Sequence, residues 1–156
     1  DPAVRGVRPF LQRAAELEAS EPVVAHFCRV HAVEQLVRAR KDGRATEESN
    51  ALLMEVFKEA EAKKQQLKQH FDLARDGQVT MEAFACRFFE NANAADLASQ
   101  PGAPQQLYLA GLFLDALAQF HGGSLPPALA EATAYAKRRA LHLRGCQQSG
   151  AQPEPP

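Results

Sequence analysis

The amino-acid sequence predicts an all-α protein built as two tandem antiparallel three-helix bundles. Apolar residues recur at three- and four-residue spacing through most of the 156 residues, which is typical of helices packed on one face. No segment shows the alternation of apolar and polar residues that marks a half-buried strand. Turns rich in glycine and proline divide the chain into six helical segments with short connections, so neighbours within each group of three should run antiparallel.

Proline, glycine and capping residues bound the expected helices of the first half. Pro22 can begin a helix because a proline in the first turn costs no hydrogen bond, and the Thr46 hydroxyl can cap the next helix. Asp76 and Gly77 are expected to form the turn at the midpoint of the chain. The expected helices of this half span residues 9–19, 22–40 and 46–73.

The second half has the same plan, and its middle helix is the most apolar. Between Pro104 and Phe120, apolar residues lie all round the helix, so neighbours must cover it on several sides and we expect it to be central. The expected helices of this half span residues 79–97, 104–120 and 126–145. The predicted domains are residues 1–76 and 77–149, and residues 150–156 have the Gln, Gly and Pro content of a linker.

Composition and charge restrict the class of function. The 18 Lys and Arg residues nearly balance the 19 Asp and Glu residues, which argues against an electrostatic nucleic-acid binder. The three cysteines are an odd number without a CxxC pair, so we expect free thiols in a reducing compartment. Neither a signal peptide nor a membrane span is predicted, because the chain opens on Asp1-Pro2-Ala3 and no apolar run approaches about 18 residues.

Two motifs imitate metal sites but lack the necessary ligands. The segment that begins at Asp72 is similar to a calcium loop, yet Ala74 and Ala83 stand where the third-position oxygen and the bidentate glutamate should be. Cys28 and His31 have a spacing found in metal sites, but no second pair completes a tetrahedral ion. No histidine pattern, phosphate loop or nucleophile motif indicates catalysis, so we expect no metal, no cofactor and no enzymatic activity.

A second apolar edge accompanies the core-facing positions of the third expected helix. Met54 and Phe57 lie beside the line of Leu53, Val56 and Ala60. Apolar edges beside a core stripe border the grooves between the helices of a bundle, where an amphipathic partner helix can lie. The alternative is that Phe57 packs on the other bundle.

Several segments, taken together and in order, resemble one family of proteins. They are residues 21–32 (EPVVAHFCRVHA), 82–92 (EAFACRFFENA) followed by Asp96, 119–123 (QFHGG), 134–140 (AYAKRRA) and 150–156 (GAQPEPP). In this combination the chain resembles the Vta/LIP family of ESCRT regulators from about Pro9 to Pro156. Arg138 and Ala134 depart from the pattern, because the family usually has Trp and Lys at these places.

The resemblance implies two tandem MIT modules, each a three-helix bundle, which bind the C-terminal helical tails of ESCRT-III subunits. Such a protein is cytoplasmic, is recruited to endosomal membranes through its partners, and acts in multivesicular-body sorting. The family's separate C-terminal domain, which dimerises and stimulates the AAA ATPase that dismantles ESCRT-III, is expected outside this chain. The alternative interpretation is a structural helical scaffold with no peptide-binding groove.

The expected peptide-binding residues combine apolar anchors with carboxylates, which complement a helix that carries leucines and basic residues. In the first module they are Met54, Glu55, Phe57, Glu59 and Glu61 on the third helix. In the second module they are Tyr108, Leu112 and Asp115, which share an exposed face of the fifth helix at i, i+4 and i+7. The two modules are expected to bind different tails.

Overall fold

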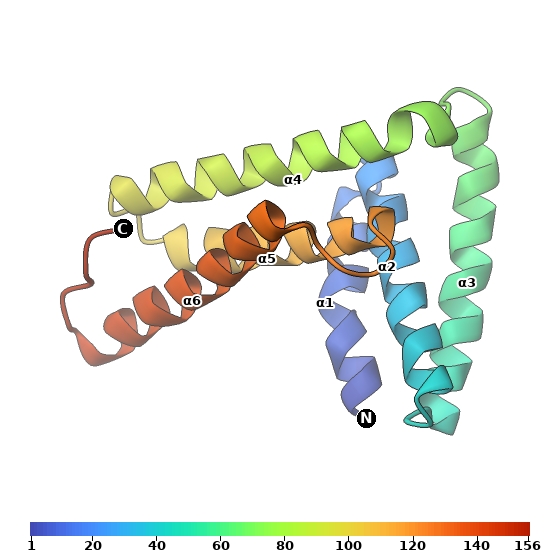
Figure 1. Ribbon diagram of the computed structural model, residues 1–156, viewed down its shortest axis with the longest axis horizontal. Helices are drawn as coiled ribbons and strands as arrows, with labels where there is room; N and C mark the ends of the chain where they lie inside the picture. Colours follow the sequence, from blue (N-terminus) through green and yellow to red (C-terminus); the bar gives the residue numbers. More distant parts are fainter. The chain divides into compact units, whose positions relative to one another are not determined.

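The protein is entirely helical. The computed structural model describes residues 1–156 and contains six α-helices and no strand, which confirms the predicted fold class (Figure 1). The helices are α1 (Pro2–Leu17), α2 (Pro22–Lys41), α3 (Glu47–Lys68), α4 (Leu73–Leu97), α5 (Ala103–Ala116) and α6 (Pro127–Ser149), and a 3-10 turn, η1 (Leu117–Phe120), follows α5. None of the helices combines the length and the apolar character needed to span a bilayer. The chain divides into two compact units, Asp1–Met81 and Glu82–Pro156.

Helix α1 begins at Pro2 and not at Pro9 as predicted. The Asp1 carboxylate caps it by accepting hydrogen bonds from two backbone N–H groups of the first turn, at N···O distances of 2.9 and 3.4 Å. Pro2 lies in the first turn, where a missing N–H costs nothing, and Val4 and Val7 are buried. Pro9 lies inside the helix, where its ring removes one backbone hydrogen bond.

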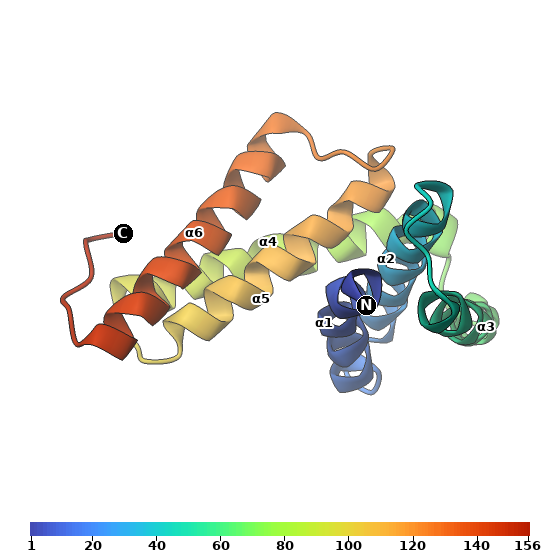
Figure 2. The same ribbon diagram turned by 90° about the horizontal axis from the view of Figure 1, so that it is seen from below.

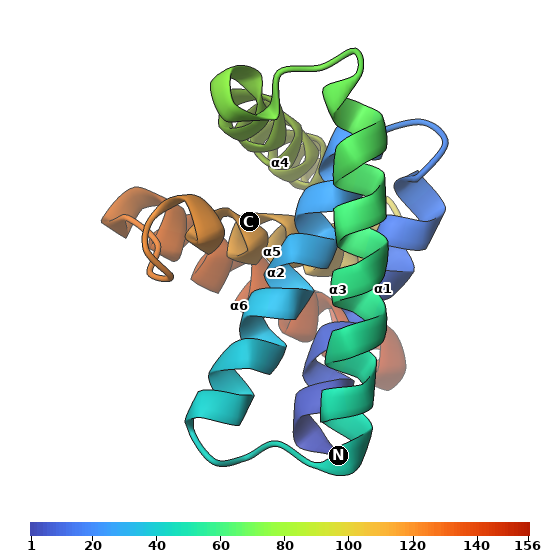
Figure 3. The same ribbon diagram turned by 90° about the vertical axis from the view of Figure 1, so that its right-hand side faces the viewer.

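In the first unit, α2 packs against both α1 and α3. Two ion pairs join α1 to α3. Arg8 Nη2 lies 3.8 Å from Glu48 Oε1 near the beginning of both helices, and Lys63 Nζ lies 2.9 Å from Glu18 Oε1 near their ends. Helices α1 and α3 therefore run parallel and α2 runs antiparallel to both, which makes an antiparallel three-helix bundle (Figure 3).

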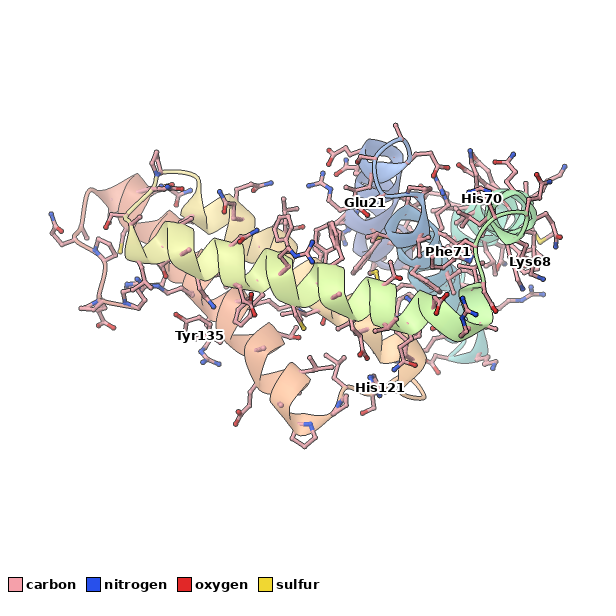
Figure 4. The ribbon with its side chains drawn as sticks, turned by 90° about the horizontal axis from the view of Figure 1, so that it is seen from above. Glu21, Lys68, His70, Phe71, His121 and Tyr135 are labelled. Atoms are coloured by element: carbon pink, nitrogen blue, oxygen red, sulfur yellow. The ribbon has the colours of Figure 1, made fainter.

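Helix α3 begins with a capping box and ends earlier than predicted. The Thr46 N–H donates to Ser49 Oγ at 2.8 Å, and the Ser49 N–H donates to Thr46 Oγ1 at 3.1 Å. The helix ends at Lys68, and Lys68, His70 and Phe71 surround the turn that follows (Figure 4). The predicted cap is confirmed, whereas the predicted end at residue 73 is wrong.

The turn between α3 and α4 lies at residues 69–72 and not at Asp76 and Gly77. The Asp72 carboxylate accepts a hydrogen bond from the Arg75 N–H at 3.1 Å, which caps the first turn of α4. The Asp76 N–H donates to the Asp72 carbonyl at 2.8 Å, so Asp76 and Gly77 are already helical. A capping aspartate therefore overrides the turn tendency of the Asp-Gly pair.

Gly77 packs against Phe27, whereas Gly6 faces open space. A Cβ atom added to Gly77 would lie 2.7 Å from Phe27 Cζ, and one added to Gly6 would meet nothing within 4 Å. Since alanine favours a helix over glycine by about 1 kcal/mol, Gly6→Ala should stabilise the protein by about that amount. Gly77→Ala should instead lower the free energy of unfolding by about 1–3 kcal/mol, because the added methyl overpacks a buried ring. Chemical denaturation of the two variants compares them, and a stabilised Gly77→Ala protein would contradict this packing.

In the second unit, α5 is the central helix, as predicted. Nine of its 14 residues are buried, and it packs closely on α6. The Phe113 ring centroid lies 5.0 Å from that of Phe84 and 5.1 Å from that of Phe88, both on α4. Glu82 Oε1 lies 3.3 Å from Nε2 of His121, which follows η1, so α4 and α5 run antiparallel, and α6 returns beside them (Figure 2).

Helix α6 ends at Ser149, later than predicted, and the chain then folds back. Gly150 adopts the left-handed conformation that ends many helices (φ 75°), and its N–H donates to the Cys146 carbonyl at 2.8 Å. The Glu154 N–H donates to Nε2 of His142 at 3.1 Å. The segment with linker composition therefore lies against its own bundle.

Candidate peptide-binding surfaces

The exposed edge of α3 carries two of the predicted apolar anchors. Met54 is 65% exposed and Phe57 is 49% exposed. At about 100° of rotation per residue, Met54, Phe57 and Glu61 lie within roughly 60° of one another, whereas Glu55 and Glu59 lie on a different side of the helix. The five residues predicted for the first module therefore lie on two different surfaces of α3 and not on the single surface that was predicted.

Glu55 borders a groove between α1 and α3. This groove has a volume of about 480 Å³. Its apolar lining comes from both helices, namely Val4, Leu11, Ala15, Ala51 and Leu52, and its polar lining is Arg8, Gln12, Glu48 and Glu55. Arg8 and Glu48 form a long ion pair across one end. The groove thus combines an apolar floor with the Glu55 carboxylate at its rim.

Glu59 belongs to an ion-pair network within the first bundle. The buried Arg29 of α2 places Nη1 at 3.2 Å from Glu18 Oε1 and Nε at 3.3 Å from Glu59 Oε1. Lys63 Nζ contacts the same Glu18 oxygen at 2.9 Å. A buried guanidinium without a partner would strongly destabilise the fold, so Glu59 contributes to holding α2 on α3. The sequence predicts Glu59 as a peptide contact, but it gives no sign of the ion pair between Glu59 and Arg29.

His26 is a buried histidine of α2. Burial lowers its pKa from 6.5 to about 4, assisted by the positive charges of Arg29 and Lys64, while Glu61 and Glu18 act in the opposite direction. The neutral imidazole is therefore favoured in the folded state. The stability that comes from the neutral His26 is complete above a pH of about 6.5 and is lost as the pH falls toward 4. At these lower pH values His26 binds a proton more readily in the unfolded chain than in the folded protein.

The free energy of unfolding should fall by about 2 kcal/mol between about pH 7.5 and pH 5 through His26 alone. Urea denaturation at the two pH values measures this change. His26→Gln, which cannot take up a proton, should lose that part of the pH dependence. Identical pH profiles for the parent protein and the variant would show that His26 titrates normally.

The face predicted for the second module is not open. Leu112 is only 8% exposed, so its expected exposure is wrong. Arg144 lies over the half-buried Tyr108 ring, with its guanidinium carbon 5.7 Å from the ring centroid, and Lys137 Nζ lies 2.6 Å from Asp115 Oδ2. Two cations of α6 therefore cover the aromatic ring and neutralise the carboxylate. A helical wheel of α5 alone contains no information about these neighbours.

A buried ion pair that the sequence analysis missed joins α4 to α6. Arg139 Nε donates to Asp96 Oδ2 at 2.7 Å, and Arg139 Nη2 donates to Asp96 Oδ1 at 3.1 Å. Both side chains are almost fully buried. The hydrogen bond to Asp96 raises the pKa of Arg139, so the guanidinium stays charged. Because 43 residues separate the partners, no local spacing rule could have paired them.

Comparison with known proteins identifies the family of this chain. A family model described as "Vta1 like" matches residues 6–149. The chain belongs to the Vta1-like family. The resemblance to the Vta/LIP family is thereby confirmed, and the assignment of two MIT modules within it stays a prediction.

Relatives from a plant, an amoeba and a mammal align with nearly the whole chain. An Arabidopsis thaliana protein named as the homolog of mammalian LYST-interacting protein 5 is 33% identical over 153 residues, which are 97% of this chain and 35% of that protein. The vacuolar protein sorting-associated VTA1 homolog of Dictyostelium discoideum is 26% identical, over 99% of this chain and 28% of its own length. The Bos taurus VTA1 homolog is 26% identical, over 98% and 50%. This chain thus spans half or less of these relatives.

Proposed function

We propose that the chain is an adaptor module of the ESCRT pathway that binds the C-terminal helical tails of ESCRT-III subunits and performs no catalysis. Relatives named as vacuolar protein sorting-associated proteins support a role in protein sorting through multivesicular bodies. In this role the protein is cytoplasmic and reaches endosomal membranes through its partners. We further propose, from the resemblance to the Vta/LIP family, that coupling to the AAA ATPase that dismantles ESCRT-III depends on a part of the protein other than these 156 residues.

The observation that carries the proposal is the pairing of apolar surface with carboxylates on both sides of α3. The edge of Met54 and Phe57 has Glu61 beside it, and the groove between α1 and α3 has Glu55 at its rim. An amphipathic segment would bury its leucines on either surface and direct its lysines or arginines to the acids. Micromolar affinity, about −8 kcal/mol, is the scale expected for one short segment.

For the second unit, Tyr108 and Asp115 remain the proposed contacts, whereas Leu112 is buried in the bundle and is no longer proposed. Lys137 and Arg144 must leave Asp115 and Tyr108 before a tail can bind there. Both cations are on exposed side chains, so their displacement costs little. Two modules that engage neighbouring ESCRT-III subunits would then gain avidity through a raised effective concentration.

Phe57→Asp should weaken the binding of one ESCRT-III tail at least tenfold and leave other tails unchanged. The introduced carboxylate must be desolvated when an apolar partner docks, and that costs more than about 1.4 kcal/mol. Fluorescence anisotropy with labelled tail peptides measures the affinities. Leu141→Asp is the matched control, because Leu141 is an exposed apolar residue of α6 and is 69% exposed.

The scaffold alternative makes the opposite prediction. If the parent protein binds no ESCRT-III tail, or if Phe57→Asp binds every tail as the parent does while circular dichroism shows both to be folded, the edge of α3 is not a binding surface. Leu112→Asp is unsuitable as the corresponding test in the second unit, because Leu112 is buried and its replacement would disturb the fold. Asp115→Asn, which keeps the shape of the side chain, tests that face instead.

A further inference from the structure

The C-terminal segment, residues 151–156, crosses a groove of the second unit. Gly150 reverses the chain at the end of α6, and Figure 1 shows the segment running back from there toward the end of α4. A cavity of about 520 Å³ lies on one side of the segment, bordered by α6, the end of α4, residues 99–101 of the turn and the start of α5. A second cavity of about 240 Å³ lies on its other side, along Tyr135, Arg138 and His142.

The two cavities are parts of one groove that the segment divides. Arg139 lines both of them, and so do Glu154, Pro155 and Pro156 of the segment itself. Gln147 Nε2 donates to the Pro101 carbonyl at 3.0 Å and so fixes α6 to the turn at one end of the groove.

The segment has the chemistry of an extended ligand. Pro153, Pro155 and Pro156 restrict the backbone to extended conformations, so little entropy is lost on docking. The Glu154 N–H makes the anchoring hydrogen bond, to His142 Nε2 at 3.1 Å. Glu154 and Arg138 both line the smaller cavity. Tyr135 supplies an aromatic wall to the same cavity, as grooves that bind proline-rich segments commonly do.

We propose that the groove along α6 is a binding surface for an extended, proline-rich segment, and that residues 151–156 of this chain occupy it in cis. The segment acts as a strap, which a partner segment of the same chemistry must displace. This surface is distinct from the edge of α3 and from the groove between α1 and α3. It therefore adds a second kind of ligand to the proposed function.

Glu154→Pro and Glu154→Gln form a matched pair that tests the strap in the complete chain. The first removes the N–H donor to His142 and keeps the backbone extended, whereas the second removes the charge and keeps the donor. Cys146 reports on the strap, because it lines the larger cavity beneath it. All proteins carry Cys86→Ser, since Cys86 is exposed, and burial raises the pKa of Cys28 to about 12, which keeps that thiol unreactive.

Loss of one hydrogen bond should shift the equilibrium between the docked and the undocked strap about fivefold. The rate of Cys146 modification by dithiobis(nitrobenzoate) should therefore rise about fivefold in Glu154→Pro. Glu154→Gln should stay within about twofold of the parent, because an exposed charge contributes little. A synthetic peptide of residues 150–156, added at millimolar concentration to Glu154→Pro, should shift the amide NMR signals of Tyr135, Arg138 and His142.

Two results would overturn the inference. One is an equal rate of Cys146 modification in the parent and in Glu154→Pro, which would mean that the strap does not hold. The other is an absence of peptide-induced shifts along α6, or shifts elsewhere only, which would mean that the groove does not bind such a segment. Neither measurement uses an ESCRT-III tail, so both outcomes are independent of tail binding.

Discussion

Phe113→Ala is expected to lower the free energy of unfolding by about 3–5 kcal/mol, because it removes a large buried side chain and leaves a cavity. Phe113 is 2% exposed on the central helix of the second unit. It makes edge-to-face contacts with Phe84 and Phe88, at interplanar angles of 88° and 61°. Both contacts are lost with the ring, and the backbone of α5 cannot collapse into the space because its other faces are also packed.

Urea denaturation followed by circular dichroism measures this loss. Phe57→Ala is the matched control, since the same substitution at a half-exposed position should change stability by less than about 1 kcal/mol. A loss below about 1 kcal/mol for Phe113→Ala would show that α5 is peripheral.

Asp96→Ala is expected to cost about 3 kcal/mol or more, because it leaves the Arg139 guanidinium buried without its partner. The pair is bidentate, with N···O distances of 2.7 and 3.1 Å. The ion pair adds less to the free energy of unfolding than this loss suggests, because both charges had to lose their water on folding. Replacement of both partners by apolar residues, as in Asp96→Leu with Arg139→Met, should therefore cost much less than Asp96→Ala alone.

A double-mutant cycle through Asp96→Ala, Arg139→Met and the double variant measures the coupling. We expect a coupling free energy of at least about 1 kcal/mol, because the two groups are in direct contact. Additive losses would contradict a direct electrostatic role for the pair and would assign the cost of each substitution to packing.

The number and order of the helices could be predicted because each helix has its own apolar spacing and short polar or proline-containing turns separate them. The boundaries were harder, since caps decide them. Asp1 moves the start of α1 ahead of Pro9, and Asp72 moves the start of α4 ahead of Gly77. A capping aspartate and an aspartate that merely precedes a turn cannot be told apart without knowing which backbone N–H groups lack partners.

The candidate surfaces could be predicted only where one helix determines them. Met54 and Phe57 are exposed in the structure, because their positions on α3 lie outside its core-facing stripe. Leu112 and Asp115 depend on α6, which provides Lys137, and Glu59 depends on the buried Arg29 of α2. Contacts between residues so distant in sequence follow from the packing of whole helices, which a single sequence does not encode locally.

The position of α4 in the chain decides where the protein can be divided into two folded fragments. The boundary between the two compact units falls inside this helix, at Met81 and Glu82, and its first turns pack against Phe27 through Gly77. A cut in the turn at residues 69–72 would remove these turns from the first unit, and a cut at residue 81 would leave the second unit with a frayed helix start. Isolated halves should therefore overlap, for example residues 1–81 and 73–156, with α4 residues present in both.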